Sequence, residues 1–175
     1  MDTATRLQSA IRDIPDFPKP GILFRDITPL LADPELFRES IAEFARICRG
    51  SGAGKIAGID ARGFLFGATV AHELGLGFVP IRKKGKLPFH AITESYDLEY
   101  GSAEIQIHTD AFRTGERVAL IDDLLATGGT AGAAIKLIRH AGATVVTAAF
   151  LIELRALGGR AALGDVPIEA IVSYP

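Results

Sequence analysis

The chain has 175 residues, a formal net charge of −2 at pH 7, and hydrophobic residues at 48% of its positions. That length is typical of one domain, and the apolar fraction is enough for a substantial core. The charge balance argues against a nucleic-acid surface, which normally carries a basic excess, and no stretch approaches the roughly 18 uninterrupted apolar residues of a membrane span. We therefore expect one domain over residues 1–175 that binds neither nucleic acid nor membrane.

The single cysteine and the charged N-terminus indicate a cytoplasmic protein. Cys48 has no partner for an internal disulfide, and its amphipathic surroundings are typical of a small buried hydrophobic residue. Asp2, Arg6 and Arg12 make the N-terminus unlike a signal peptide.

The N-terminal part of the chain predicts a short helix, an irregular segment and a long helix. Thr3–Ile11 can form a short helix, and residues 13–21 then contain three prolines and a glycine, which is typical of irregular extended chain. Asp33 and Pro34 form a clear helix start, with the aspartate as N-cap and the proline at the first helical position. Apolar residues recur at helical spacing until residues 50–54 end this scaffold helix.

A first apolar run leads into a turn with a possible anion site. Lys55–Ile59 is predicted to be a strand, and a helix is expected from about Phe64 to Leu74. Between them lies Asp60-Ala61-Arg62-Gly63. A helix that starts directly after a strand is a common phosphate site. On its own, the turn is also explained as an ordinary helix start that Asp60 caps.

A second apolar run leads into a basic segment. Gly77–Ile81 is predicted to be a strand, and Arg82-Lys83-Lys84-Gly85-Lys86 follows it. Such a run is usually a solvated face, but here it leaves the sheet at the edge where Arg62 lies and can stabilise a multiply charged leaving group. Residues 87–101 read as a loop entering a two-stranded excursion, with Ala103–His108 as the returning strand.

The stretch Arg117–Thr130 has the features of a sugar-phosphate pocket. Val118–Ile121 is a continuous apolar run, which predicts a strand buried on both faces of a parallel sheet. Asp122 and Asp123 follow at its carboxyl end, where open α/β sheets bind ligands, and carboxylates accept hydrogen bonds from vicinal hydroxyls.

The next five residues, Ala126-Thr127-Gly128-Gly129-Thr130, precede a helix expected over Ala131–Ala141. Small residues let backbone amides approach a phosphate, threonine hydroxyls add donors, and the helix directs its positive end at the anion. The simpler interpretation is a solvated turn with ordinary capping residues. The ordered set of strand, acids, glycine loop and helix favours the pocket.

The remaining elements predict the fold class. Ala143–Ile152 reads as a buried strand, residues 156–164 as helix or turn, and Ile168–Val172 as a final strand. The alternation of strands and helices predicts an α/β fold, with a mainly parallel sheet and helices on both faces. The four histidines show no metal-ligand spacing, so we expect no metal site built by the protein itself.

Several motifs, in order along nearly the whole chain, resemble those of one enzyme family. The run from Asp122 to Thr130 resembles the phosphoribosyl-pyrophosphate (PRPP) loop of the type I phosphoribosyltransferases, in the form found in members that act on adenine. Four more segments are similar to that branch of the family: Asp16–Ile27, Asp60–Phe64, Arg82–Pro88 and Tyr96–Gly101. The resemblance implies the type I phosphoribosyltransferase fold, with an N-terminal hood over residues 1–30 and a flexible hairpin lid over residues 83–108.

The resemblance also implies an activity, the transfer of the phosphoribosyl group of PRPP to adenine to give AMP and pyrophosphate in purine salvage. The implied PRPP-binding residues are Ala61, Arg62, Arg82, Lys83, Lys86, Tyr100, Asp122, Asp123, Ala126, Thr127, Gly128, Gly129 and Thr130. The implied adenine-binding residues are Leu23, Phe24, Arg25 and Leu124. Phe24 would stack on the purine. Without the resemblance, it is more simply an aromatic that anchors its loop to the core.

The resemblance implies catalytic roles for Arg62 and Glu99. Arg62 would stabilise the departing pyrophosphate, and Glu99 in the lid would either manage a proton on the base or position the lid. The family's pyrophosphate turn has an unusual peptide geometry, and we expect a cis peptide between Ala61 and Arg62.

A cofactor and a partner are implied as well. Mg²⁺ would be carried mainly by PRPP and pyrophosphate, because all-protein Mg²⁺ cages are uncommon. In relatives of this fold the basic run often reaches a neighbouring subunit, which implies a homodimer. Two alternatives stay open, namely an enzyme of the same fold acting on xanthine, hypoxanthine or uracil, and a PRPP-sensing regulator without catalysis. A regulator needs a DNA-binding module, and the residues before Pro15 are too few for one.

Overall fold

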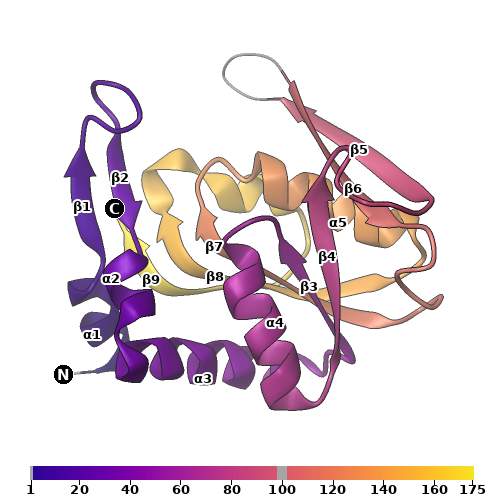
Figure 1. Ribbon diagram of the computed structural model, residues 1–175, viewed down its shortest axis with the longest axis horizontal. Coiled ribbons are helices and arrows are strands. Elements are labelled where there is room, and N and C mark those ends of the chain that lie inside the picture. The colour runs from indigo at the N-terminus through magenta and orange to yellow at the C-terminus, as the bar shows by residue number, and fades with distance from the viewer. Residues whose placement is uncertain (1, 98–101) are drawn as a thin grey trace.

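The computed structural model describes residues 2–97 and 102–175, and a seven-stranded sheet forms its centre (Figure 1). The strand order is β5-β6-β4-β3-β7-β8-β9. The strands are β3 (Lys55–Ile59), β4 (Gly77–Lys83), β5 (Ala91–Asp97), β6 (Ser102–His108), β7 (Arg117–Leu125), β8 (Thr144–Leu154) and β9 (Ile168–Tyr174). From β4 to β9 all neighbours pair in parallel, whereas β6 is antiparallel to both β4 and β5. The predicted mainly parallel sheet is confirmed.

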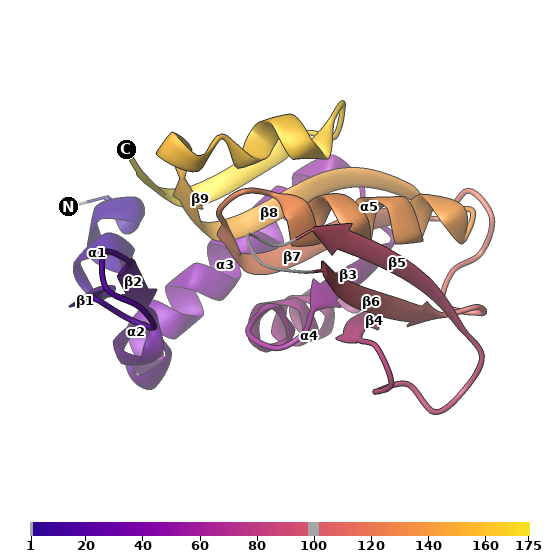
Figure 2. The ribbon, with the colours of Figure 1, turned by 90° about the horizontal axis from the view of Figure 1, so that it is seen from above.

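Helices cover both faces of the sheet, as predicted (Figure 2). They are α1 (Thr3–Ser9), α2 (Thr28–Ala32), α3 (Pro34–Ser51), α4 (Gly63–Leu74) and α5 (Gly129–His140), with short 3-10 segments η1 (Arg155–Leu157) and η2 (Gly159–Leu163) between β8 and β9. The apolar side of α5 packs on one face with the inward residues of β3, β4 and β7. The apolar sides of α1, α3 and α4 pack on the other face. Within the described residues, no helix is long and apolar enough to cross a membrane.

The N-terminal segment is more regular than its prolines predicted. Residues Arg12–Pro15 form β1, which pairs antiparallel with β2 (Leu23–Asp26) in a separate two-stranded hairpin. The prediction of irregular chain over residues 13–21 is therefore wrong at its start. Pro15 is tolerated because it ends a strand with one neighbour only, where a missing N–H disturbs no continuous ladder. The hairpin stands beside the C-terminal end of β9 (Figure 1).

The long helix α3 begins where the sequence predicted. The Asp33 carboxylate accepts the backbone N–H groups of Glu35 and Leu36 at 2.9 and 3.0 Å, and Pro34 occupies the first turn. Cys48 on its inner side is fully buried, as expected for a small hydrophobic residue. Its burial raises the pKa of the thiol to about 12.

Strand β3 and helix α4 approach so closely that a side chain at Gly58 has no room. A Cβ atom there would lie 2.7 Å from Phe78 Cε2 and 3.1 Å from the Gly63 carbonyl oxygen. The Phe78 ring is itself held in an edge contact with Phe64, with their centroids 5.7 Å apart. This close approach brings the start of α4, and with it Arg62, against the end of β7.

Replacing Gly58 with Ala is expected to lower the free energy of unfolding by about 1–3 kcal/mol, the usual cost of overpacking. Denaturant unfolding would measure the change. Gly77→Ala is a matched control, because Gly77 also lies in a strand but its Cβ would meet Lys55 at an ordinary 3.5 Å. Equal losses in the two variants would contradict the packing argument.

Candidate active site

A pocket of about 210 Å³ lies at the carboxyl end of β7 and brings most of the central motif together. Its lining consists of Arg62, Asp122, Asp123, Leu124, Leu125, Ala126, Thr127, Gly128, Gly129, Thr130 and Ala131. The lining is one continuous stretch of chain plus a single arginine from another turn. The sequence predicted every one of these residues as part of the site except Leu125 and Ala131.

The two acids lie within β7 and not after it, which corrects the predicted end of that strand. Pairing with β8 continues through Asp122 and Leu125, which face Phe150 and Glu153. The regular alternation of faces nevertheless breaks here. Ile121 and Leu124, three residues apart, both pack with the cluster on the α3 and α4 side, whereas a regular strand would put them on opposite faces. Asp122 and Asp123 fall in this irregular part, and both reach the same pocket.

Asp123 is paired with Arg62 across the pocket. The carboxylate belongs to a residue that is only 5% exposed, and Arg62 Nε donates to its Oδ2 atom. The guanidinium carbon of Arg62 also lies 5.7 Å from the centroid of the Phe24 ring, a distance typical of a cation–π contact. One cation therefore links the acid of β7 to the N-terminal hairpin.

Asp122 has a different environment from its neighbour. Its Oδ1 atom accepts the backbone N–H of Asp123 at 2.9 Å, and it faces Gly63, where an added Cβ would lie only 2.8 Å away. Burial of the carboxyl group, reinforced by the negative charge of Asp123, raises the pKa of Asp122 well above its ordinary value of 3.8. A charged Asp122 in the ligand-free protein is therefore costly.

Replacing Asp122 with Asn is expected to raise the Tm of the ligand-free protein at neutral pH. Because the pKa of Asp122 is higher in the folded protein than in the unfolded chain, stability is lost as the pH rises from 3.8 through the folded value. Asparagine carries no such penalty, and its oxygen can still accept the Asp123 N–H. The Tm difference, measured from about pH 4 to about pH 8, should grow with pH. Parallel curves would contradict the assignment.

The glycine loop leads directly into α5. Gly128 is the N-cap residue with φ of 84°, and the helix begins at Gly129, two residues earlier than predicted. Gly129 and Thr130 therefore belong to the first helical turn. The first backbone N–H groups of any helix have no partner inside it and can bind an anion. The structure thus places such donors on the pocket wall opposite Arg62.

The turn after β3 differs from the predicted peptide geometry, and it also contradicts the simpler interpretation of a helix start capped by Asp60. The cis peptide joins Asp60 to Ala61 and not Ala61 to Arg62. The Asp60 N–H still bonds to the Ile81 carbonyl at 2.9 Å, so the chain leaves the sheet at the following peptide. Nor does Asp60 cap α4, whose N-cap is Arg62 without a side-chain cap. The Asp60 carboxylate instead accepts a hydrogen bond from Arg82 Nε at 3.2 Å.

The basic run divides into parts with different surroundings. Arg82 is held near the turn by Asp60 and by the Lys86 carbonyl, to which its guanidinium donates at 3.1 Å. Lys84 pairs with Glu104 of β6 at 2.7 Å. Lys83 and Lys86 are exposed, and neither lines the pocket. Glu99 and Tyr100, expected in the lid, lie outside the described residues.

The predicted adenine-binding residues lie mainly on β2. Phe24 is half-buried and makes an edge contact with Phe17, with centroids 5.2 Å apart. The guanidinium of Arg25 lies 3.8 Å from the centroid of the Tyr174 ring and pairs with Asp13. Tyr174 thus fixes the hairpin to β9, a role that the sequence did not suggest. Arg25 and Tyr174 are far apart in the sequence, so no local sequence pattern could predict their contact.

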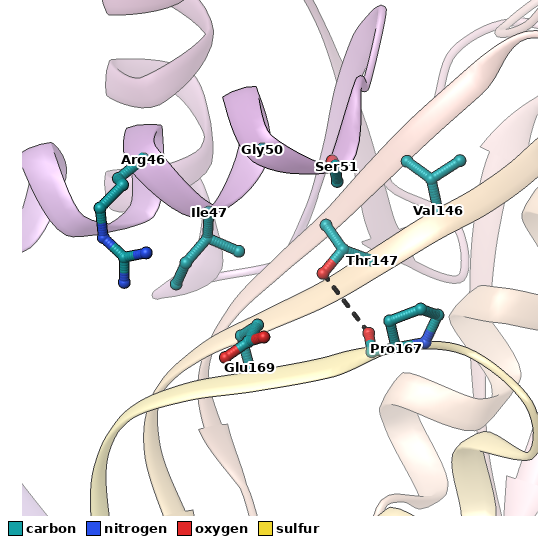
Figure 3. Close-up of a pocket in the computed structure, with 8 residues that line it drawn as sticks. All are labelled: Arg46, Ile47, Gly50, Ser51, Val146, Thr147, Pro167 and Glu169. Carbon is teal, nitrogen blue, oxygen red and sulfur yellow. Dashed lines mark hydrogen bonds between the residues drawn. The ribbon is translucent and has the colours of Figure 1, made fainter.

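A pocket of about 300 Å³ lies at the opposite end of the sheet, between α3 and the amino ends of β8 and β9 (Figure 3). Three of its polar side chains are already bonded. Arg46 pairs with Glu43 at 2.9 Å, Thr147 Oγ1 donates to the Pro167 carbonyl at 3.4 Å, and Ser51 Oγ donates to the Cys48 carbonyl at 2.8 Å. It has no glycine loop or facing pair of acids, so the pocket of β7 remains the candidate site.

Known proteins are similar to this chain in both sequence and fold. Residues 30–164 match the phosphoribosyl transferase domain family. An adenine phosphoribosyltransferase from Bradyrhizobium sp. (strain BTAi1) is 56% identical over 170 residues, which are 96% of this chain and 95% of the relative. The crystal structure of adenine phosphoribosyltransferase from Thermoanaerobacter pseudethanolicus has a TM-score of 0.95 at 47% identity, over 98% of this chain and 99% of that one.

A third relative was solved with ligands. The Saccharomyces cerevisiae adenine phosphoribosyltransferase, complexed with adenine and an imino-altritol bisphosphate, has a TM-score of 0.93 at 39% identity, over 97% of this chain and 98% of that one. The family match covers most of the chain, and the relatives are similar over nearly all of it. The chain belongs to the phosphoribosyltransferase family and, within it, to the adenine phosphoribosyltransferases.

Proposed function

We propose that the protein transfers the phosphoribosyl group of PRPP to adenine, with AMP and pyrophosphate as products. The observation that carries this proposal is the pocket of β7, where two carboxylates and a glycine loop at a helix start face Arg62. Membership of the adenine phosphoribosyltransferases supports the choice of substrates, and the ligands of the yeast relative include adenine.

In the proposed complex each part of PRPP meets a different part of the pocket. The loop Ala126–Thr130 holds the 5-phosphate through backbone amides and threonine hydroxyls. Asp122 and Asp123 accept hydrogen bonds from the two ribose hydroxyls. Pyrophosphate lies toward Arg62 and the turn at Ala61, with Arg82 beside it. This order follows the chemistry of the lining, with donors at both phosphate ends and acceptors in the middle.

The proposed reaction is a displacement at ribose C1. The bond from C1 to the pyrophosphate oxygen breaks with its electron pair on the leaving group, and adenine N9 forms the new bond. The proton on N9 passes to the Glu99 carboxylate, or to solvent if Glu99 only positions the lid. Positive charge develops on the ribose, and the carboxylates of Asp122 and Asp123 stabilise it more strongly once water is excluded. Arg62 stabilises the negative charge that gathers on pyrophosphate. We assign Glu99 to the base proton or to lid positioning.

Adenine is proposed to lie between the N-terminal β1–β2 hairpin and the pocket of β7. Phe24 supplies an aromatic face, backbone groups of Leu23 and Arg25 meet the edge of the base, and Leu124 covers its other side. Support comes from Phe24 lying near Arg62 and from Leu124 lining the pocket. The N-terminal region, residues 1–30, would then act as the hood, and residues 83–108 as a lid that excludes water.

Mg²⁺ is proposed to arrive with PRPP. Among residues 2–97 and 102–175 no group of three or more His, Cys, Asp or Glu side chains is placed to hold a metal. Oxygens of PRPP and water would supply most of its ligands, because Mg²⁺ keeps several waters and is usually bound through substrate phosphates. The ion would neutralise part of the charge on pyrophosphate.

We further propose a cytoplasmic homodimer built from this single domain. Lys83 and Lys86 are exposed and lie outside the pocket of their own chain, which leaves them available to a neighbouring subunit. Sedimentation at working concentration, compared between the protein and Lys83→Ala/Lys86→Ala, would test the dimer and the contribution of these lysines to it.

The activity is tested with a panel of five bases. The protein is mixed with PRPP and Mg²⁺ and with adenine, hypoxanthine, guanine, xanthine or uracil, and pyrophosphate release is measured. We expect release with adenine alone, together with AMP. Release with a 6-oxopurine would keep the PRPP site but overturn the roles of Phe24 and Leu124. Binding of PRPP without release for any base would favour a regulator.

A further inference from the structure

Segment η2 touches the glycine loop through bare backbone. A Cβ on Gly128 would collide with the Gly159 carbonyl oxygen and lie 2.8 Å from Ala162 Cβ. A Cβ on Gly159 would in turn collide with the Ala126 carbonyl oxygen. One turn further along α5, a Cβ on Gly132 would lie 2.9 Å from the Ala162 carbonyl oxygen. The shape of the loop is therefore set by the position of η2.

Segment η2 is a short element with little rigidity of its own. Glycines with φ of 65° and 64°, Gly158 and Gly164, flank it on both sides. A 3-10 turn of five residues has poor hydrogen-bond geometry and little stability of its own. Leu163 anchors its far end in the core, where it is 2% exposed. Its other end meets the glycine loop at Gly159.

The contact at that end is an ion pair between Arg160 and Glu153. Arg160 donates from Nε to Glu153 Oε1 at 2.6 Å and from Nη2 to Oε2 at 2.8 Å, and its third nitrogen reaches the Ile168 carbonyl at 3.2 Å. Ser173 Oγ lies 3.4 Å from the same carboxylate. A two-pronged pair of this kind fixes orientation as well as distance.

Glu153 is an unusual residue to find inside a sheet. It is 3% exposed, and its strand β8 aligns it with Leu125 of β7 and Ser173 of β9. The hydrogen bonds from Arg160 lower the pKa of Glu153, so the carboxylate stays charged at neutral pH. Leu125 immediately precedes the glycine loop. The pair therefore ties η2 to β8, the neighbour of the strand β7 from which the loop leaves.

We propose that Glu153 and Arg160 are positioning residues for the glycine loop: their ion pair presses η2 against Ala126–Gly129 and so aligns the amides that bind the 5-phosphate. The inference rests on the proposed function, in which that loop holds the 5-phosphate of PRPP. Neither side chain touches substrate. Their effect passes through the backbone contact between Gly159 and the loop.

The test uses Arg160→Met, which keeps an aliphatic side chain but removes the guanidinium group that pairs with Glu153. Arg160 is 49% exposed at its side chain, so the variant should fold. We expect the Kd for ribose 5-phosphate and the KM for PRPP to rise by up to about 100-fold, because a distant change that misplaces a group by about 1 Å can cost that much. The KM for adenine and the Kd for inorganic pyrophosphate should stay unchanged, because those ligands meet the hairpin and the Arg62 turn.

Three companion variants sharpen the result. Arg160→Lys keeps the positive charge but cannot make the two-pronged contact, so it should recover part of the affinity for ribose 5-phosphate. Glu153→Gln should lower that affinity as much as Arg160→Met does. If Arg160→Met does not fold, these two variants carry the same test. Arg139→Met is the matched control, since it breaks a 2.7 Å arginine–carboxylate pair to Asp165, in the connection that follows η2, without touching the loop.

The possible outcomes separate this inference from the proposed function. If the wild-type protein binds ribose 5-phosphate and releases pyrophosphate with adenine, but Arg160→Met binds ribose 5-phosphate equally well, the inference alone is overturned. Equal weakening of ribose 5-phosphate, pyrophosphate and adenine would overturn it too, because that pattern reports general destabilisation. A wild-type protein that binds no ribose 5-phosphate would overturn the proposed function, and the inference with it.

Discussion

Replacing Asp123 with Asn is expected to lower kcat with PRPP and adenine by about 10²- to 10³-fold, the usual effect of removing one group that stabilises transition-state charge. The residue is 5% exposed, so water screens little of its attraction for a cationic ribose. Asparagine has the same shape and still accepts a hydrogen bond from a hydroxyl. The KM for PRPP should therefore change far less than kcat, which steady-state kinetics would measure.

The control for this variant is Asp165→Asn. The side chain of Asp165 is 84% exposed and pairs with Arg139 outside the pocket, so its loss should leave kcat unchanged. The affinity for pyrophosphate should also be measured in Asp123→Asn, because Arg62 loses its charged partner there. A rise in the KM for PRPP with kcat unchanged would reduce Asp123 to a binding group and contradict the charge-stabilising role.

Replacing Gly128 with Ala is expected to raise the KM for PRPP about 10- to 100-fold, because overpacking costs about 1–3 kcal/mol and every 1.4 kcal/mol is a factor of ten. The new Cβ would collide with the Gly159 carbonyl oxygen, and the backbone at Gly128 has φ of 84°, which alanine adopts poorly. The atoms that the new Cβ would meet are the Gly159 carbonyl oxygen and Ala162 Cβ, and no side-chain rotation can move either of them. The loop must therefore move away from η2 and misplace its amides.

Gly75→Ala is a control that separates the effect of the positive φ from the effect of the collision with η2. Gly75 ends α4 with φ of 66°, and a Cβ there would meet nothing within 4 Å. It should lose some thermal stability and keep the KM for PRPP. If Gly128→Ala lowered Tm by the same amount and left that KM unchanged, the loop would not depend on its contact with η2.

Arg62 lies between strand β7 and the N-terminal β1–β2 hairpin, which are far apart in the sequence. Its guanidinium meets Asp123 on one side and the Phe24 ring on another. Pyrophosphate bound at this turn would compete with Asp123 for the same cation and so release the carboxylate toward the ribose. This exchange would couple occupation of the pyrophosphate position to the charge available at the hydroxyl position.

The sequence by itself determined the elements whose signals are local. Asp33 and Pro34 predicted the start of α3 because a capping carboxylate and a proline act on the turn beside them. Lys55–Ile59 was predicted to the residue because a short buried strand between glycine-rich turns has a clear apolar pattern. The run Asp122–Thr130 predicted one wall of the pocket for the same reason, since its residues are adjacent in the chain.

Only the tertiary structure decided which distant side chains meet one another. Arg62 on Asp123, Arg25 on Tyr174 and Arg160 on Glu153 are ion pairs or stacking contacts whose partners no local pattern identifies. The prolines before Gly21 predicted irregular chain where the structure has a hairpin. Strand pairing depends on the partner strand, here Leu23–Asp26, as much as on the segment itself. Local sequence predicts the conformation of a turn, but packing between elements determines what that turn faces.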